Sequence, residues 1–112
     1  MIGITTHVLD TAAGRPAAGL AVTLERMHDD GSWMPVGSGT TDSDGRLRTL
    51  LQTPPGTATY RLTFETEPYF ASTGTKTFFP RIAIIFHAVA AEEQYHVPLL
   101  LSPFAYSTYR GS

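Results

Sequence analysis

The sequence has 112 residues, which predicts one domain over residues 1–112. It lacks cysteine, which excludes disulfides and thiolate chemistry, and its formal charge of −2 includes no basic stripe that would indicate nucleic acid binding. It has no apolar run near the ~18 residues of a membrane span and no signal peptide at its start, so we expect a cytoplasmic protein, or a periplasmic one if a signal peptide has been removed.

Short stretches that alternate apolar and polar residues, separated by turn residues, are typical of an all-β sandwich. The first stretch, residues 4–10, places His7 and Leu9 on one face and Val8 on the other. We expect seven or eight strands, among them residues 4–10, 20–27, 32–40, 57–67 and 81–89 and two more within residues 95–110.

Three of these segments carry further positional signals. Pro35 favours an edge position for the strand at 32–40, because proline cannot donate to a sheet ladder. RIAIIFHAV, residues 81–89, is apolar on both faces, which predicts a central strand. Residues 67–74 break the alternation and indicate one short helix.

Alternation also divides the terminal strands into two faces. We expect the sandwich core to contain Val8, Val97, Leu99 and Leu101. We expect the opposite face to carry His7, Leu9, His96, Pro98, Leu100, Ser107 and Tyr109. An ordinary solvent face would carry Lys and Glu, so this half-apolar face is predicted to be covered, most simply by another subunit.

A structural role is the alternative for each of the four histidines, because a lone strand histidine is commonly only a packed, hydrogen-bonded group. His28 lies beside a DDG turn and is expected to be solvated, whereas His87 is expected to be a hydrogen-bonded core or interface group. Alternation does not show that His7 and His96 meet.

The remaining motifs limit the kinds of site that the sequence could form. TDSDGR, residues 41–46, lacks the later ligands of a calcium loop, so we interpret it as a glycine turn that orients Arg46. The histidine spacing does not favour zinc, and neither Ser107 nor Ser112 lies in a nucleophile elbow, so no metal is expected. The candidates that remain suit attack of water on a polarised carbonyl and are His7, Arg46, His96, Tyr109 and Ser112.

Two segments at opposite ends of the chain, TTHVLDTAAGRPAAGL and YHVPLLLSPFAYSTYRGS, resemble the signature segments of the 5-hydroxyisourate hydrolases, the transthyretin-like enzymes of urate breakdown. The resemblance implies a transthyretin-like β-sandwich of two four-stranded sheets with one short helix. It also implies a homotetramer, a dimer of dimers, whose active sites lie in the channel between the dimers. Transthyretin shares the fold but lacks the YRGS ending and the two histidines.

The resemblance further implies hydrolysis of 5-hydroxyisourate to 2-oxo-4-hydroxy-4-carboxy-5-ureidoimidazoline without a cofactor. Residues match the family motifs at His7, Arg46, His96, Tyr109 and Ser112. We expect His7 and His96 to activate and position the water and Arg46 to stabilise the oxyanion. Tyr109 and Ser112 are expected to contact the substrate, with Leu100 and Ser107 on the same face.

Two other functional classes stay open at this point. Transthyretin-like folds also serve as binding modules for small aromatic ligands, and similar sandwich modules serve as structural interaction domains. Paired histidines together with an arginine favour the enzyme over a carrier, which does not need proton-transfer groups, and the YRGS ending favours it over an appended module, which would not need this ending.

Overall fold

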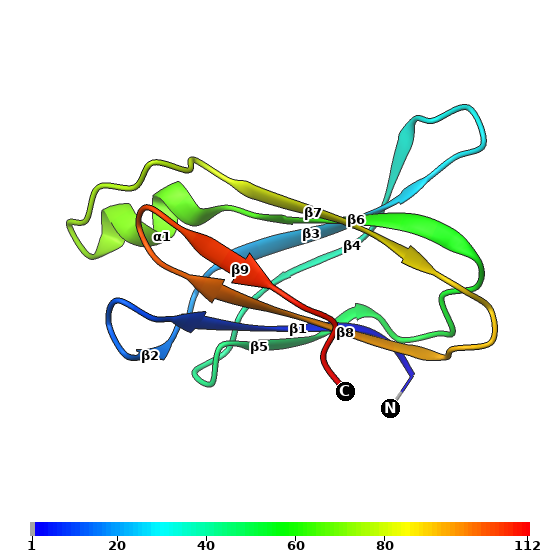
Figure 1. The fold of residues 1–112 in the computed structure, drawn as a ribbon, viewed down its shortest axis with the longest axis horizontal. Coiled ribbons are helices and arrows are strands. Elements are labelled where there is room, and N and C mark those ends of the chain that lie inside the picture. The colour runs from blue at the N-terminus through cyan, green and yellow to red at the C-terminus, as the bar shows by residue number, and fades with distance from the viewer. Residues whose placement is uncertain (1) are drawn as a thin grey trace.

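A computed structural model describes residues 2–112 and shows two stacked β-sheets with one short helix at one end (Figure 1). The elements, in chain order, are β1 (Gly3–Asp10), β2 (Arg15–Pro16), β3 (Ala21–Met27), β4 (Trp33–Thr40), β5 (Arg46–Leu51), β6 (Ala58–Phe64), α1 (Thr66–Ser72), β7 (Ile82–Ala88), β8 (Gln94–Leu101) and β9 (Tyr106–Thr108). The expected all-β sandwich with one short helix is therefore confirmed.

One sheet has the order β4-β3-β6-β7. The other has the order β2-β1-β8-β9, with β5 also paired to β1. This second sheet has five strands instead of the expected four, because the two-residue β2 pairs with the end of β1 through Leu9↔Pro16 and Asp10↔Arg15. Strands β1 and β8 are parallel neighbours although they come from opposite ends of the chain, so the two histidine-bearing segments lie side by side.

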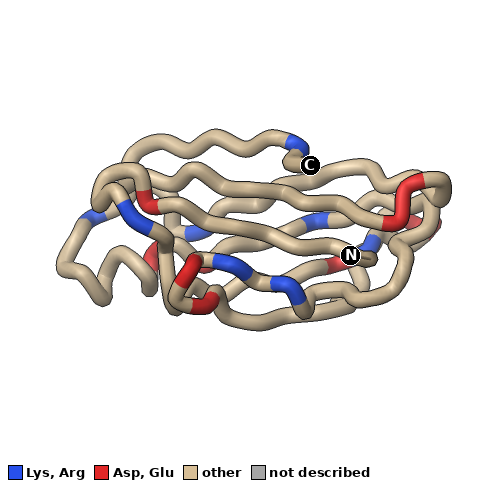
Figure 2. Tube along the Cα trace, turned by 90° about the horizontal axis from the view of Figure 1, so that it is seen from below, with Lys and Arg blue, Asp and Glu red and all other residues tan. Residues whose placement is uncertain are grey.

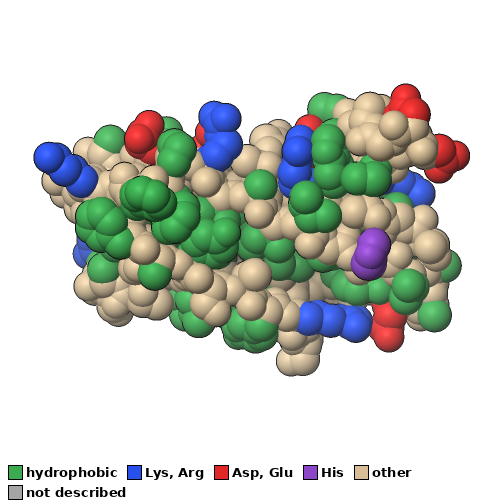
Figure 3. All heavy atoms as spheres, turned by 45° about the horizontal axis from the view of Figure 1, so that its top comes forward, with side chains coloured by type: hydrophobic (Ala, Val, Ile, Leu, Met, Phe, Trp, Pro, Cys, Tyr) green, Lys and Arg blue, Asp and Glu red, His purple; other side chains and the backbone are tan. Residues whose placement is uncertain are grey.

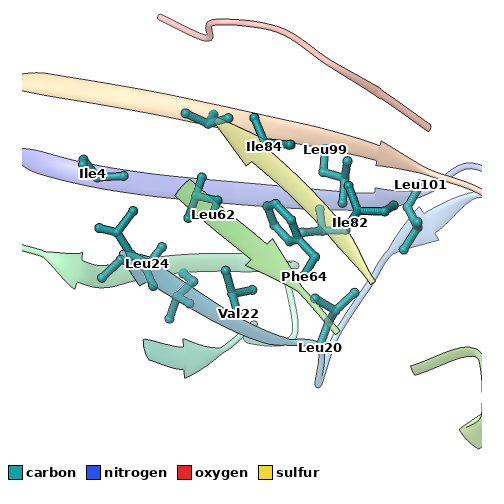
Figure 4. Close-up of a cluster of buried hydrophobic side chains, with 14 of the residues drawn as sticks. Ile4, Leu20, Val22, Leu24, Leu62, Phe64, Ile82, Ile84, Leu99 and Leu101 are labelled. Carbon is teal, nitrogen blue, oxygen red and sulfur yellow. The ribbon is translucent and has the colours of Figure 1, made fainter. Parts of the chain in front are cut away.

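The core lies between the sheets and is filled by the inward residues of both (Figure 4). Val8 and Leu99 are fully buried, and Val97 and Leu101 are nearly so, which confirms the face assigned to them from alternation. Removing one large apolar side chain of this kind from water contributes ~1.5–3 kcal/mol to folding. The core therefore holds the outward residues of β1 and β8 at fixed positions.

The two outer strands of the four-stranded sheet are β4 and β7, and the sequence predicted a position in the sheet for each. β4 is an edge strand, as Pro35 predicted. The expected central position of residues 81–89 is wrong, because β7 is the other edge and Ile85 is 60% exposed. Within the single chain only the inner face of β7 is covered, and its outer face leaves apolar side chains exposed.

Helix α1 packs against the same end of the sandwich as the end of β1. Phe70 is buried in the core, and the Tyr69 hydroxyl donates a 2.7 Å hydrogen bond to Oδ2 of Asp10. Burial and the Asp10 carboxylate raise the pKa of Tyr69 to about 12. No helix within residues 2–112 is long and apolar enough to cross a membrane.

Candidate active site

A cleft of about 190 Å³ lies on the outer side of the five-stranded sheet, where β1 runs between β5 and β8. The start of β1 and the end of the chain also lie near each other (Figure 1). The cleft is lined by Thr5, Thr6, Arg46, Arg48, Gln94, His96 and Ser112. Three of the predicted site residues, Arg46, His96 and Ser112, are thus brought together by the fold.

His96 projects outward from β8, between β1 and the segment that follows β9. Its register partner on β1 is Thr5, whose Oγ1 lies 2.8 Å from the imidazole Nδ1. On the other side Gly111 pairs with His96 and donates its backbone N–H to the His96 carbonyl at 2.8 Å. The ring is therefore held between two strands and is half-buried.

His7 lies on the same face of the sheet, two residues beyond Thr5 along β1. Its register partners are Arg46 on β5 and Pro98 on β8, and its side chain is half-buried. It does not line the cleft itself, but it lies near enough to His96 to contribute to lowering the pKa of that residue. The fold thus places both predicted histidines on one face, with Arg46 beside His7.

Arg46 is the last residue of TDSDGR and the first residue of β5, and the turn in this segment determines its position. Oδ1 of Asp42 accepts the backbone N–H groups of Asp44 and Arg46, each at 2.9 Å. Gly45 has φ of 74°, a conformation that L side chains rarely adopt, and a Cβ there would lie 2.4 Å from the Val8 carbonyl oxygen. The expectation of a glycine turn that orients Arg46 is confirmed.

The cleft is positively charged. Both Arg46 and Arg48 line it, and no acidic side chain does. The ion pairs found within residues 2–112 use other arginines, namely Arg61, Arg81 and Arg110, and basic positions are scattered along the backbone trace (Figure 2). The two guanidinium groups are therefore available to carbonyl or carboxylate oxygens of a ligand.

The surroundings of His96 also favour the neutral form of its ring. Burial lowers its pKa most, and the neighbouring His7, Arg46 and Arg48 lower it further. A neutral imidazole can accept or donate a proton through its outer nitrogen, which suits it to act on water or on a carbonyl.

The last residues of the chain are ordered against the sheet. Arg110 lies over the Tyr95 ring at 4.7 Å and pairs with Glu92 at 3.6 Å. Gly111 continues the β8–β9 register, and Ser112 reaches the cleft. These contacts match the expectation that the tail closes the site.

The other predicted site residues lie outside this cleft in the single chain. Leu100 and Ser107 are register partners on the same outer face, with Leu100 half-buried and Ser107 exposed. Tyr109 is 57% exposed and lines a separate hollow between β7 and β9, with Ile85 and Phe86. Their contact with a ligand stays a prediction.

A family model described as HIUase/Transthyretin family matches residues 4–111. The chain belongs to this family. It is 46% identical over 110 residues to the 5-hydroxyisourate hydrolase of Salmonella dublin, covering 97% of this chain and 80% of the relative.

Solved structures of the family agree. The Klebsiella pneumoniae 5-hydroxyisourate hydrolase superimposes with a TM-score of 0.87 and 36% identity, covering all of both chains. Sea bream transthyretin in complex with thyroxine superimposes with a TM-score of 0.89 and 30% identity, covering 96% of this chain and 93% of that chain. The expected family is confirmed, and the names of the relatives support the hydrolase class.

Sequence reasoning did not single out four residues of the cleft, namely Thr5, Arg48, Gln94 and Thr6. Alternation contained a signal for the first two, because Thr5 shares the face of His7 and Arg48 shares that of Arg46. Arginine and threonine are common on solvent faces, so the signal becomes specific only once the cleft is known.

The two other histidines lie away from the cleft. His28 is exposed, as expected. His87 is exposed on β7 with its Nδ1 3.2 Å from the Thr59 hydroxyl, so the hydrogen bond is confirmed and the core position is wrong. No three His, Cys, Asp or Glu side chains of residues 2–112 are grouped so as to bind a metal ion.

Replacing Gly111 with alanine should impair the cleft. A Cβ at this position would lie 2.6 Å from Cδ2 of His96 and 3.1 Å from Cγ of Pro98, so the imidazole would have to move. We expect Gly111→Ala to lower turnover ~10- to 100-fold, because small displacements of a reacting group have effects of this size. Steady-state kinetics and the thermal midpoint test this, and normal turnover would show that the contact is unimportant.

Proposed function

We propose that this chain hydrolyses 5-hydroxyisourate to 2-oxo-4-hydroxy-4-carboxy-5-ureidoimidazoline, a step of urate degradation. The observation that carries the proposal is the cleft, which joins His96 and Ser112 from the end of the chain with Arg46 from its middle, while His7 from the first strand lies beside Arg46. The names of the most similar relatives support the same substrate.

The proposed reaction begins with water, which His7 and His96 together position and which one of the two histidines deprotonates. The water oxygen bonds to the acyl carbon of the six-membered ring, and Arg46 stabilises the negative charge on the carbonyl oxygen. The ring C–N bond then breaks, its electron pair passes to the nitrogen, and that nitrogen takes the proton. The acid formed ionises, and the two unpaired arginines of the cleft suit its carboxylate.

The size of the cleft suits a small ligand and a shared site. Its volume of about 190 Å³ is below the ~300–1,000 Å³ of pockets that enclose drug-sized ligands. We propose that a second copy of the chain covers it, and that Tyr109, Leu100 and Ser107 contact the substrate or line the channel in the assembly.

The exposed apolar side chains support assembly into the proposed homotetramer, a dimer of dimers. Apolar groups gather on the face that Figure 3 shows, over the β7 and β9 edges. The large exposed ones of these two strands and their neighbouring loops are Phe78, Ile85, Val89, Phe104, Tyr106 and Tyr109. Edge strands with exposed apolar residues favour pairing with another chain, and light scattering of the purified protein tests the tetramer.

A carrier of small aromatic ligands is the second candidate, because the transthyretin neighbour is solved in complex with thyroxine. A carrier has no need for a neutral imidazole beside an unpaired guanidinium. The discriminating experiment is the absorbance of freshly generated 5-hydroxyisourate with and without the protein. Faster decay supports the hydrolase, and an unchanged decay at micromolar protein would refute it.

Arg46→Lys should fail to support catalysis. One ammonium cannot replace the planar set of donors of a guanidinium. We expect the barrier to rise on the order of 3 kcal/mol, the effect of losing one oxyanion donor. Arg48→Lys is the matched control, because it keeps the charge of the cleft and leaves Arg46 in place. Full activity of Arg46→Lys would reduce Arg46 to general charge attraction.

A further inference from the structure

The hydrogen bond between Thr5 and His96 bears on the position of the imidazole ring and on which ring nitrogen carries the proton. Thr5 is only 4% exposed, and its Oγ1 lies 2.8 Å from Nδ1 of His96. A hydroxyl carries one hydrogen, and a neutral imidazole has one donor nitrogen and one acceptor nitrogen. Either Thr5 donates to Nδ1, or an Nδ1–H group donates to Thr5.

Burial of Thr5 distinguishes these two arrangements. Within residues 2–112, Nδ1 of His96 is the one hydrogen-bond partner found for the Thr5 hydroxyl. If Nδ1 carried the proton, the hydrogen of this hydroxyl would have no acceptor in the described part of the protein and would need a water from the cleft that Thr5 lines, which is less favourable for a group so little exposed. Donation from Thr5 to Nδ1 satisfies both groups, and it requires the imidazole proton to be on Nε2.

The orientation of the ring places Nε2 toward the cleft. The Nδ1 side of the ring faces Thr5 on β1, and the Cδ2 side abuts Gly111, where an added Cβ would lie 2.6 Å away. Nε2 and Cε1 form the end of the ring farthest from the backbone, and since Nδ1 is bonded to Thr5, Nε2 is the ring nitrogen left for the cleft that His96 lines. The group that His96 presents to a ligand is therefore an N–H donor.

We propose that Thr5 is a positioning residue that holds His96 in the Nε2–H tautomer, so that His96 donates a hydrogen bond to the substrate carbonyl and His7 is the base. This inference rests on the proposed function, which it deepens by dividing the roles of the two histidines. His7 removes a proton from the attacking water and returns it to the ring nitrogen as the C–N bond breaks. His96 keeps its proton throughout, so protons balance.

The charge state of His96 agrees with this division. Burial, His7 and the two arginines of the cleft all lower its pKa, which favours the neutral ring. A charged ring would also direct a second N–H at Thr5 and displace the Thr5 hydrogen from its acceptor. A neutral imidazole can polarise a carbonyl in this way.

The first test is the tautomer itself, measured by long-range ¹H–¹⁵N NMR on the wild-type protein with His96 assigned from a His96→Gln variant. We expect a protonated Nε2 and an unprotonated Nδ1, and we expect this neutral state to persist below pH ~6.5, the ordinary histidine pKa. A protonated Nδ1 at neutral pH would overturn the inference.

The second test removes the hydroxyl without changing the shape of the side chain. We expect Thr5→Val to yield a mixture of tautomers and to lower kcat roughly tenfold, the effect of one neutral hydrogen bond, with little change in KM. Thr5→Ser should restore both the tautomer and kcat. Unchanged tautomer and kcat in Thr5→Val would also overturn the inference.

Thr66→Val is the matched control. Thr66 is fully buried and donates to the Phe79 carbonyl at 2.8 Å, far along the chain from the cleft residues. It should leave the His96 tautomer and kcat unchanged, and equal losses in both valine variants would refute a specific role for Thr5. A wild-type protein with the Nε2–H tautomer but no hydrolysis would refute the proposed function while supporting the Thr5–His96 assignment.

Discussion

Deleting residues 109–112 is expected to abolish hydrolysis of 5-hydroxyisourate and to leave a folded β protein. The deletion removes Gly111, which abuts the His96 ring and donates its backbone N–H to the His96 carbonyl. It also removes Ser112, which lines the cleft. Circular dichroism and the absorbance assay on wild type and truncation measure the two effects together.

The fold should survive this deletion because the tail contributes little to stability. None of its residues belongs to the core. The Arg110–Glu92 pair is exposed, and such pairs contribute ~0–1 kcal/mol. An exposed cation–π contact like that of Arg110 on Tyr95 contributes ~0.5–1 kcal/mol. The thermal midpoint should therefore fall by only a few degrees.

Arg110→Ala is the control that separates loss of the contacts that hold the tail from loss of the tail residues at the cleft. It removes both contacts of Arg110 but keeps Gly111 and Ser112, so we expect partial activity. Light scattering of the same proteins tests whether the tail also supports assembly. An active monomer, or a truncation with unchanged turnover, would contradict a site completed by the tail and shared between copies.

Substitution of either cleft histidine should be nearly as damaging. We expect His7→Ala and His96→Ala each to lower turnover by ~100-fold or more, the usual contribution of a positioned acid, base or oxyanion donor. The core should tolerate both changes, because both side chains project from the outer face of the sheet and are half-buried.

His28→Ala supplies the matched control, since His28 is exposed and lies outside the cleft. It should retain wild-type turnover. The double variant His7→Ala/His96→Ala should lose less than the product of the single losses, because the two groups act on one transition state. Near wild-type turnover in both single variants would remove histidine from the mechanism.

Alternation along the strands was sufficient to predict much of this protein. It assigned Val8, Val97, Leu99 and Leu101 to the core, because successive side chains of a strand point to opposite faces whatever the neighbouring strands are. The glycine turn before Arg46 was equally local, since Asp42 and Gly45 act on backbone within a few residues. The family was predicted from a different signal, the resemblance of the two terminal segments to its signature motifs, and of the residues matched to those motifs Arg46, His96 and Ser112 line the cleft.

Only the tertiary structure decided which strands are neighbours, because sheet register is set by pairing between distant segments. The parallel pairing of β1 with β8 joins Thr5 to His96 across 91 positions of sequence and so selects the tautomer that we infer for His96. Register likewise placed β7 at an edge although its sequence is apolar on both faces. The segment after β9 places Tyr109 in a hollow beside Ile85, outside the cleft. Alternation could not predict this position, because it assigns faces only within a strand and Tyr109 follows the last one.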